Sequence, residues 1–296
     1  MMKYTFCQDI GGRKEQEDAV EVFESKNHLF MVLADGMGGH EGGAIASSIL
    51  LETAKGYFSS HPELLYSPFK FFTSIIQESI YRLKEQYIDT TLDPNTTLVM
   101  ALIVENTLYY CYIGDSRLYL FEKKKGLIFR TRDDSIPEIL FQQKKITEEE
   151  ISTHSEQNVL TKSLNMKSTD RPSLGKIKLS KSKEYRILLA SDGLWAMIDA
   201  INIYKELFYS SNTLEVSTKN LLKIAKNRAG KHGDNISIAT VVIERKHRYN
   251  FRILTSMILF ILLLLGFVFY FLEKEPILIE EQNKNYHRPS KSWNTG

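Results

Sequence analysis

The chain has 296 residues, of which 43% are hydrophobic and 25% are charged, and its formal net charge is +2 at pH 7. These proportions are typical of a globular protein and allow one large domain or two small ones. The near-neutral charge, with Lys and Arg dispersed, excludes a nucleic-acid-binding surface. Two cysteines, Cys7 and Cys111, are too few for a disulfide framework or a zinc site, so we expect free thiols in a reducing compartment.

The N-terminal part of the sequence predicts three short strands and then two helices. Runs rich in aromatic and β-branched residues, bounded by Gly, Asn or Asp, indicate strands at 4–8, 19–23 and 29–34. Apolar residues then recur every three or four positions, which predicts amphipathic helices over 43–58 and 69–87.

Beyond these helices the sequence returns to strands, interrupted by further helices. Strands are expected at 97–105, 108–113, 117–121, 127–131, 173–179, 185–190 and 235–244. Helices are expected at 135–141, 147–152, 198–209 and 213–229. Thr147 and Glu150 form a capping-box pattern at the second of these helices. Blocks of antiparallel strands with helix pairs between them predict one layered α+β domain over residues 1–244.

The C-terminal part of the chain is predicted to cross a membrane. Residues 253–272 form a run of twenty residues without a charge, dense in Leu, Ile and Phe. A helix of this length spans about 30 Å, the thickness of a bilayer core, whereas a soluble helix this long keeps a polar face. A basic segment, 245–252, precedes the span and a polar tail, 273–296, follows it. We therefore expect a single-pass protein of the cell membrane whose main domain faces the cytoplasm.

Acidic residues stand next to the ends of several predicted strands. Asp35 and Asp192 each follow an apolar strand, and Asp234 precedes the last strand. If these strand ends lie side by side, three carboxylates meet at one rim, and their repulsion requires cations between them. Oxygen ligands without clustered His or Cys favour Mg²⁺ or Mn²⁺.

Two such ions can share a water molecule and direct it at a phosphorus atom. Gly36 has no Cβ, so its carbonyl can approach a metal closely. Arg13 is the candidate for binding phosphate oxygens bidentately. This combination predicts hydrolysis of phosphate esters without a covalent intermediate.

A series of short motifs resembles the metal-dependent Ser/Thr protein phosphatases of type 2C (the PPM family) in their bacterial form. In chain order the matching segments are Arg13–Asp18, Ala34–His40, Asn95–Leu98, Gly114–Arg117, Thr153–Thr161, Ser191–Trp195 and Asp234–Asn235. Each motif alone is weak, but the ordered set covers nearly all of residues 4–244. Gln16, Asn95, Lys162 and Asn165 stand where that family usually has Asn, Gly, Arg and Gly.

The resemblance implies a fold and a ligand set. The fold is a four-layer αββα sandwich, in which helix pairs flank two central antiparallel sheets, and here a C-terminal transmembrane helix follows it. Asp35 would bridge two Mn²⁺ or Mg²⁺ ions. Asp192 and Asp234 would complete the first site, and the carbonyl of Gly36 would serve the second.

The remaining roles also follow from the resemblance. Asp18, and Glu17 less directly, would hold water molecules of the metal shell. Asp115 with Asp192 would form a weaker third metal site, and Arg13 would bind the substrate phosphate.

Several of these residues have a second interpretation. Asp115 can belong to an Asp-Ser-Arg turn with a local ion pair, and Arg13 can be a surface residue. His40 can protonate the leaving serine or threonine oxygen as a general acid, or it can be a solvated loop histidine or a residue that orients a metal ligand. We expect Trp195 to pack in the core.

The sequence therefore predicts a membrane-tethered protein phosphatase acting on phosphoserine and phosphothreonine, by in-line attack of a water that bridges two metal ions. Its partners would be phosphorylated proteins, with receptor-type Ser/Thr kinases and their substrates as the hypothesis. The alternative is a catalytically inactive phosphatase fold that binds phosphoproteins at the membrane. The departures at Gln16, Asn95, Lys162 and Asn165 keep that alternative open, and the intact set of aspartates argues against it. A phosphatase that acts on regulators of transcription factors would differ only in its substrate.

Overall fold

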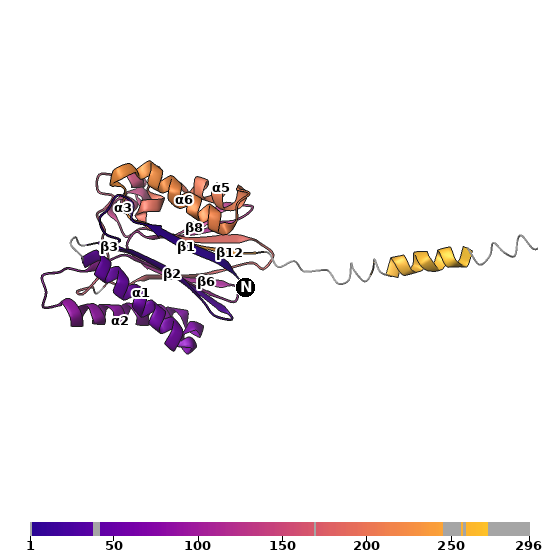
Figure 1. Ribbon diagram of the computed structural model, residues 1–296, viewed down its shortest axis with the longest axis horizontal. Coiled ribbons are helices and arrows are strands. Elements are labelled where there is room, and N and C mark those ends of the chain that lie inside the picture. The colour runs from indigo at the N-terminus through magenta and orange to yellow at the C-terminus, as the bar shows by residue number, and fades with distance from the viewer. Residues whose placement is uncertain (1, 38–41, 169, 245–255, 257–258, 272–296) are drawn as a thin grey trace, which may run out of the picture. The chain divides into compact units, whose positions relative to one another are not determined.

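The computed structural model describes residues 2–37, 42–168, 170–244, 256 and 259–271. The chain divides into two units, Met1–Lys246 and His247–Gly296. In the first unit two antiparallel sheets stack face to face, with α1 and α2 outside one sheet and α5 and α6 outside the other (Figure 1). The predicted α+β fold with two central antiparallel sheets is confirmed.

All strand pairs in the two sheets are antiparallel. The five-stranded sheet has the order β1 (Lys3–Asp9), β12 (Ile236–Ile243), β11 (Tyr185–Ala190), β7 (Arg117–Glu122) and β8 (Gly126–Arg130). The other sheet has the order β10 (Ser173–Lys178), β6 (Thr107–Ile113), β5 (Leu98–Val104), β3 (His28–Met37), β4 (Asn95–Thr96) and β9 (Leu164–Asn165), and β2 (Asp18–Glu24) also pairs with β3. The two-residue strands β4 and β9 were not predicted from the sequence.

In the first unit the helices lie outside the sheets. They are α1 (Gly42–Ser60), α2 (Pro68–Tyr87), α3 (Ile136–Gln142), α4 (Asp192–Trp195), α5 (Ala200–Tyr209) and α6 (Leu214–Ala229), with 3-10 turns at Pro62–Tyr66, Glu149–Thr153 and Gly230–His232. The helix predicted at 147–152 is the second of these 3-10 turns. Its capping box is present, since the Thr147 amide donates to Glu150 Oε2 at 2.6 Å and the Glu150 amide donates to Thr147 Oγ1 at 3.4 Å. Helix α4 and the turn Pro62–Tyr66 were missed.

Strand β3 shows how one apolar run fills two cores. Successive side chains of a strand point to opposite faces of its sheet. Phe30 and Val32 pack with α1 and α2, whereas Met31 and Leu33 pack between the two sheets. A third apolar cluster lies between the five-stranded sheet and α5 and α6. The two buried faces explain why β3 reads as a continuous apolar run rather than as an alternating one.

Only part of the predicted C-terminal span lies in the described residues. Ser256 and residues 259–271 are helical, and their side chains are exposed. Residues 253–255, 257, 258 and 272 of the predicted span, with the segments 245–252 and 273–296, lie outside the described residues. Within the part of the chain that the structure describes, no helix has the length and apolar character needed to cross a membrane.

Candidate active site

Five aspartates gather at one end of the two sheets, and we call them the carboxylate cluster: Asp18, Asp35, Asp115, Asp192 and Asp234. Strand pairing brings them together. Asp18 lies opposite Asp35 across β2 and β3, and the end of β11 lies beside the starts of both β7 and β12. Asp115 comes just before β7, Asp192 follows β11, and Asp234 comes just before β12. The strand ends that carry carboxylates therefore meet, as the sequence predicts.

Asp18 is the most isolated carboxylate of the cluster. Its side chain is 4% exposed, and neither carboxylate oxygen has a hydrogen-bond partner among the described residues. Burial raises the pKa of Asp18 to about 7, the nearby hydroxyls of Ser237 and Ser191 oppose this rise without reaching hydrogen-bond geometry, and the charges of Asp192 and Asp234 add to it. A buried carboxylate without hydrogen-bond partners destabilises the folded protein. Asp18 is therefore suited to binding a cation or ordered water.

Asp35 and Asp192 are half-buried and lie near each other. Burial raises the pKa of Asp35 well above its usual range, and the charges of Asp18 and Asp192 raise it further. Burial and the charge of Asp234 raise the pKa of Asp192 to about 6, although the amide of Gly193 and a hydrogen bond with Asp35 act in the opposite direction. These carboxylates are close enough to repel one another when ionised.

Asp115 faces the same cluster rather than its own neighbour in sequence. Burial raises its pKa well above the usual range, and the charges of Asp192 and Asp133 add to this. Arg117 does not pair with Asp115. It is bound to Asp133, with Nη2 at 2.6 Å from Oδ2 and Nε at 2.9 Å from Oδ1. The described residues therefore contain no ion pair between Asp115 and Arg117, and the metal role of Asp115 stays a prediction.

The donor set of the cluster suits hard cations. In the described residues, no three His, Cys, Asp or Glu side chains are placed to share a single metal ion. The cluster therefore lacks a complete three-carboxylate site. Mg²⁺ and similar ions need only one or two carboxylates and complete their shell with water and carbonyl oxygens. The unpartnered oxygens of Asp18 and the crowded charges of the cluster fit such ions, and the individual ligand assignments stay predictions.

Arg13 lies at the rim of the cluster. Its Nη2 donates to Asp234 Oδ2 at 2.5 Å, and both side chains are partly exposed. Arg13 is thus not an isolated surface residue. Its guanidinium has five donors, so it can bind a second oxyanion while it stays near Asp234.

Asn235 fixes the loop that carries Arg13 and Glu17. Its Nδ2 donates to the carbonyls of Ile10 at 2.9 Å and Glu15 at 3.0 Å, and its Oδ1 accepts from the Glu17 amide at 2.7 Å. Sequence reasoning placed Asn235 in a motif without giving it a role. The sequence feature that could have indicated this role is an amide side chain, with two donors and an acceptor, directly after the predicted metal ligand Asp234.

Gly36 and Glu17 meet at the start of α1. A Cβ on Gly36 would lie 2.2 Å from the carbonyl oxygen of Gly43 and 2.6 Å from that of Glu17. The Gly36 amide donates to the Glu17 carbonyl at 3.1 Å. The close contact of β3, α1 and this loop requires glycine at position 36, whatever its carbonyl binds. Burial raises the pKa of the Glu17 carboxyl, the charge of Arg13 opposes this, and the charge of Asp234 adds to it.

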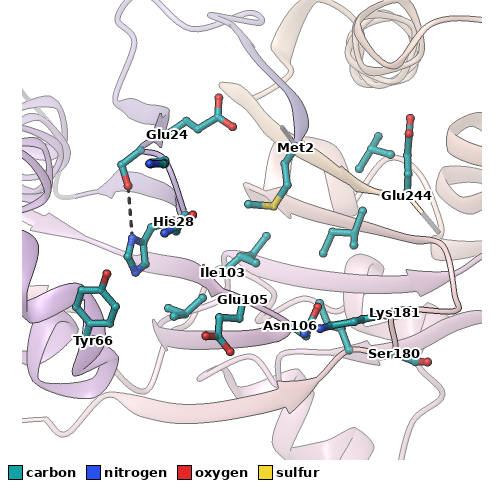
Figure 2. Close-up of a pocket in the computed structure, with 17 residues that line it drawn as sticks. Met2, Glu24, His28, Tyr66, Ile103, Glu105, Asn106, Ser180, Lys181 and Glu244 are labelled. Atoms are coloured by element: carbon teal, nitrogen blue, oxygen red, sulfur yellow. Dashed lines mark hydrogen bonds between the residues drawn. The ribbon is translucent and has the colours of Figure 1, made fainter. Parts of the chain in front are cut away.

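His40 lies outside the described residues, so its three interpretations stay open. Another histidine, His28, lines a separate hollow of about 650 Å³ (Figure 2). There Ser25 Oγ lies 3.5 Å from His28 Nδ1, the ring packs edge-on against Tyr66, and Nε2 has no partner among the described residues. This hollow shares no residue with the carboxylate cluster.

Comparisons with known proteins agree with the motifs. The family profile described as Protein phosphatase 2C matches residues 10–223. The protein phosphatase PhpP of Streptococcus pneumoniae is 28% identical over 251 residues, which cover 83% of this chain and 99% of that protein.

Solved structures give the same result. The Ser/Thr phosphatase Stp1 of Staphylococcus aureus superposes with a TM-score of 0.72 and 27% identity, over 82% of this chain and 96% of that one. The catalytic domain of the Ser/Thr protein phosphatase PstP, solved with 2 manganese ions, has a TM-score of 0.67 and 26% identity, over 82% of this chain and 99% of that one.

Proposed function

The chain belongs to the protein phosphatase 2C family and is a Ser/Thr phosphoprotein phosphatase, and we propose that it works with two Mn²⁺ or Mg²⁺ ions held at the carboxylate cluster. The observation that carries this proposal is the crowding of Asp18, Asp35, Asp115 and Asp192, of which Asp18 and Asp115 are buried and the other two half-buried. Carboxylates held this close need cations to ionise together. The manganese complex of the relative PstP supports the same choice of metal.

The residues that would hold the ions follow from their donors. Asp35, Asp192 and Asp234 would be direct ligands with the carbonyl of Gly36, and Asp18 and Glu17 would bind water molecules around the ions. Asp115 with Asp192 would form a third site. When bound, the ions lower the pKa of a water molecule, orient it toward phosphorus and neutralise phosphate charge.

The chain itself contributes substrate binding and a fixed geometry. Arg13 would bind phosphate oxygens with the donors that Asp234 leaves free. Asn235 holds the loop of Arg13 and Glu17 in place through three hydrogen bonds. The position of the cluster at the sheet end, with Asp18 and Asp115 buried, limits how far its carboxylates can separate, so their charges act on whatever enters between them.

A test of the function compares two substrates and one variant. The full chain, with Mn²⁺, should hydrolyse an aryl phosphate and a phosphothreonine peptide, and EDTA should remove both activities. Asp192→Asn keeps the shape of the side chain and should abolish hydrolysis. A folded, Mn²⁺-loaded protein that hydrolyses neither substrate would contradict the proposal.

We also propose that the protein is tethered to the cell membrane by residues 253–272, with the phosphatase domain in the cytoplasm. The uncharged composition of this segment and the basic residues before it support the proposal. Phosphorylated membrane proteins, among them receptor-type Ser/Thr kinases, would then be the substrates within reach.

Fractionation tests the tether. The full chain should stay with membranes after a carbonate wash, whereas a Leu263→Lys, Leu264→Lys variant should be released because each lysine disfavours insertion by about 2.5–3.5 kcal/mol. Release of the unaltered chain would contradict the tether and leave the enzymatic proposal intact.

A further inference from the structure

A hollow of about 740 Å³ opens beside α4, where it meets the β7–β8 hairpin and the start of α5. Its walls are mainly aromatic and apolar, with Tyr119, Trp195, Ile198 and Tyr204 among them. Small-molecule sites have this range of volume and combine apolar walls with a few polar groups. No residue of the carboxylate cluster lines the hollow, so the proposed reaction does not use it.

The charges free to act in this hollow are mainly positive. Lys124 and Lys125 line it from the β7–β8 hairpin, and neither lysine forms an ion pair within the described residues. Arg228 lines the same hollow and donates to the Met197 carbonyl at 2.7 Å, which leaves donors of its guanidinium for another acceptor.

The acidic residues of the hollow are mostly engaged elsewhere. Glu148 accepts from Arg130 Nε at 2.5 Å, and Asp199 accepts from the Asn202 amide at 2.8 Å as the N-cap of α5. Glu149 is the remaining acidic residue of the lining. The excess of unengaged cations therefore favours an anionic ligand.

Trp195, which lines the hollow, also carries a buried hydrogen-bond donor without a partner among the described residues. Its side chain is 4% exposed, and its Nε1–H has no acceptor among the described residues. An indole nitrogen can only donate, and a buried donor is normally paired. The missing partner of the indole Nε1–H of Trp195 is thus a hydrogen-bond acceptor, such as an oxygen of a carboxylate or phosphate.

The wall of the hollow is directly connected to the carboxylate cluster. The guanidinium carbon of Arg117 lies 3.6 Å from the centre of the Trp195 ring, and Asp133 holds that guanidinium from its other side. We call these three residues the Arg117–Trp195 clamp. Arg117 is two residues after Asp115, and Trp195 is three residues after Asp192 in the single turn of α4. A ligand in contact with Trp195 would therefore affect the positions of both segments that carry the proposed third metal site, those of Asp115 and Asp192.

We propose that this hollow binds a small ligand with a carboxylate or phosphate on an aromatic or apolar body, and that its occupancy changes the metal affinity of the carboxylate cluster through the Arg117–Trp195 clamp. The coupling rests on the proposed metal site, whereas the binding itself does not. The aromatic walls bind the body, and Lys124, Lys125 and Trp195 bind the anionic group.

The binding test uses 2-naphthoate as the probe and calorimetry on the full chain in detergent without metal. We expect saturable binding, weakened about fivefold by the double substitution Lys124→Ala, Lys125→Ala, as for other partly exposed charge pairs. The amide 2-naphthamide has the same body without the charge and should bind at least as weakly. Lys178→Ala removes an exposed lysine at the end of β10 and should leave the affinity unchanged.

Two results would overturn the site. They are no binding of 2-naphthoate to the folded protein and equal binding by the double lysine variant. A Trp195→Phe variant tests the donor, and it should also bind the probe more weakly while it keeps an aromatic ring under Arg117.

The coupling is tested by repeating the titration with saturating Mn²⁺. Because coupling between two sites is reciprocal, the dissociation constant of 2-naphthoate should change by about threefold or more. An identical constant with and without bound Mn²⁺ would overturn the coupling. A protein that binds the probe but no Mn²⁺ would refute the proposed function and leave the ligand site standing.

Discussion

Asp18 and Asp35 lie directly opposite each other on the paired strands β2 and β3, where Asp18 is buried and Asp35 is half-buried. Cross-strand neighbours are close, and like charges placed opposite each other are destabilising. A fold that keeps this pair without cations stores unfavourable electrostatic energy, which divalent ions would remove. The first two predictions follow from this relationship.

Replacing Asp35 by Asn should raise the stability of the metal-free protein and abolish its phosphatase activity. The variant keeps the size of the side chain and removes one half-buried charge from the crowded cluster, so the metal-free protein should gain roughly 1–3 kcal/mol at pH 8. It should also lose the stabilisation that Mn²⁺ gives and lose phosphatase activity. Thermal unfolding with and without Mn²⁺ measures both effects, and the exposed Asp89→Asn should change neither. A metal-free variant less stable than the parent would contradict the account.

The metal-free protein should become less stable as the pH rises from about 4 to about 7. The pKa of Asp18 is raised from 3.8 to about 7, mainly by burial, and that of Asp192 to about 6. The folded state therefore binds these protons more tightly than the unfolded state does. Their stabilising contribution is complete below pH 4 and is lost as the pH passes the folded-state values. Urea unfolding in EDTA measures this trend, and a stability that rises across the same range would refute it.

Substitution of Gly36 should disrupt the site through packing. A Cβ there would lie 2.2 Å from the Gly43 carbonyl oxygen, so Gly36→Ala must displace either β3 or the start of α1. We expect a loss of about 2 kcal/mol or more and a large loss of Mn²⁺ affinity. Gly56 inside α1 is the matched control, because a Cβ added there would meet nothing within 4 Å. Gly56→Ala should be stabilising by about 0.5–1 kcal/mol.

Replacing Arg117 by lysine should destabilise the protein. Its two bonds to Asp133 and its stacking on Trp195 need a planar guanidinium, and the pair is almost fully buried. Arg117→Lys should therefore lower the free energy of unfolding by roughly 2–4 kcal/mol. Arg132→Lys changes an exposed arginine of the same segment and should be nearly neutral. Equal stability of both variants would show that the buried pair adds nothing.

Asn235→Ala should affect substrate binding more than turnover. It removes the three hydrogen bonds that hold the loop of Arg13 and Glu17. We expect KM for a phosphopeptide to rise about tenfold, with a smaller change in kcat, because the phosphate-binding guanidinium loses its fixed position. Asn227→Ala on the exposed face of α6 is the control. A variant with unchanged KM would remove Asn235 from the positioning of Arg13.

The sequence predicted the frame of this domain because its two strongest signals agree with the structure. Apolar runs such as that of β3 and helical spacing such as that of α2 persist over many residues, so tertiary packing reinforces the local pattern. Short elements gave no such signal. The turn of α4 is four residues long, and β4 and β9 have two residues each. Only their neighbours in space define them.

The site was predicted in its residue types and less well in its contacts. Asp residues at strand ends form a pattern that is visible in the sequence. Gly36, directly after Asp35, indicates a place where the backbone comes close to another group. The partner of Arg117 is 16 residues away in Asp133, and Arg13 contacts Asp234 across 221 positions. Such pairs depend on which strands of the five-stranded sheet pair with each other, here β7 with β8 and β1 with β12, which no local window contains. For the same reason the sequence could not show that Asn235 holds the loop of Arg13.

The measurement that tests the central claim most directly is the number of divalent ions that the protein binds. The full chain, stripped with EDTA and dialysed against Mn²⁺, should hold about two ions per chain by elemental analysis, and Asp35→Asn should hold at most one, since Asp35 would bridge both. A folded protein that retains no Mn²⁺, or an Asp35→Asn variant that retains as much as its parent, would contradict a metal centre built on the carboxylate cluster.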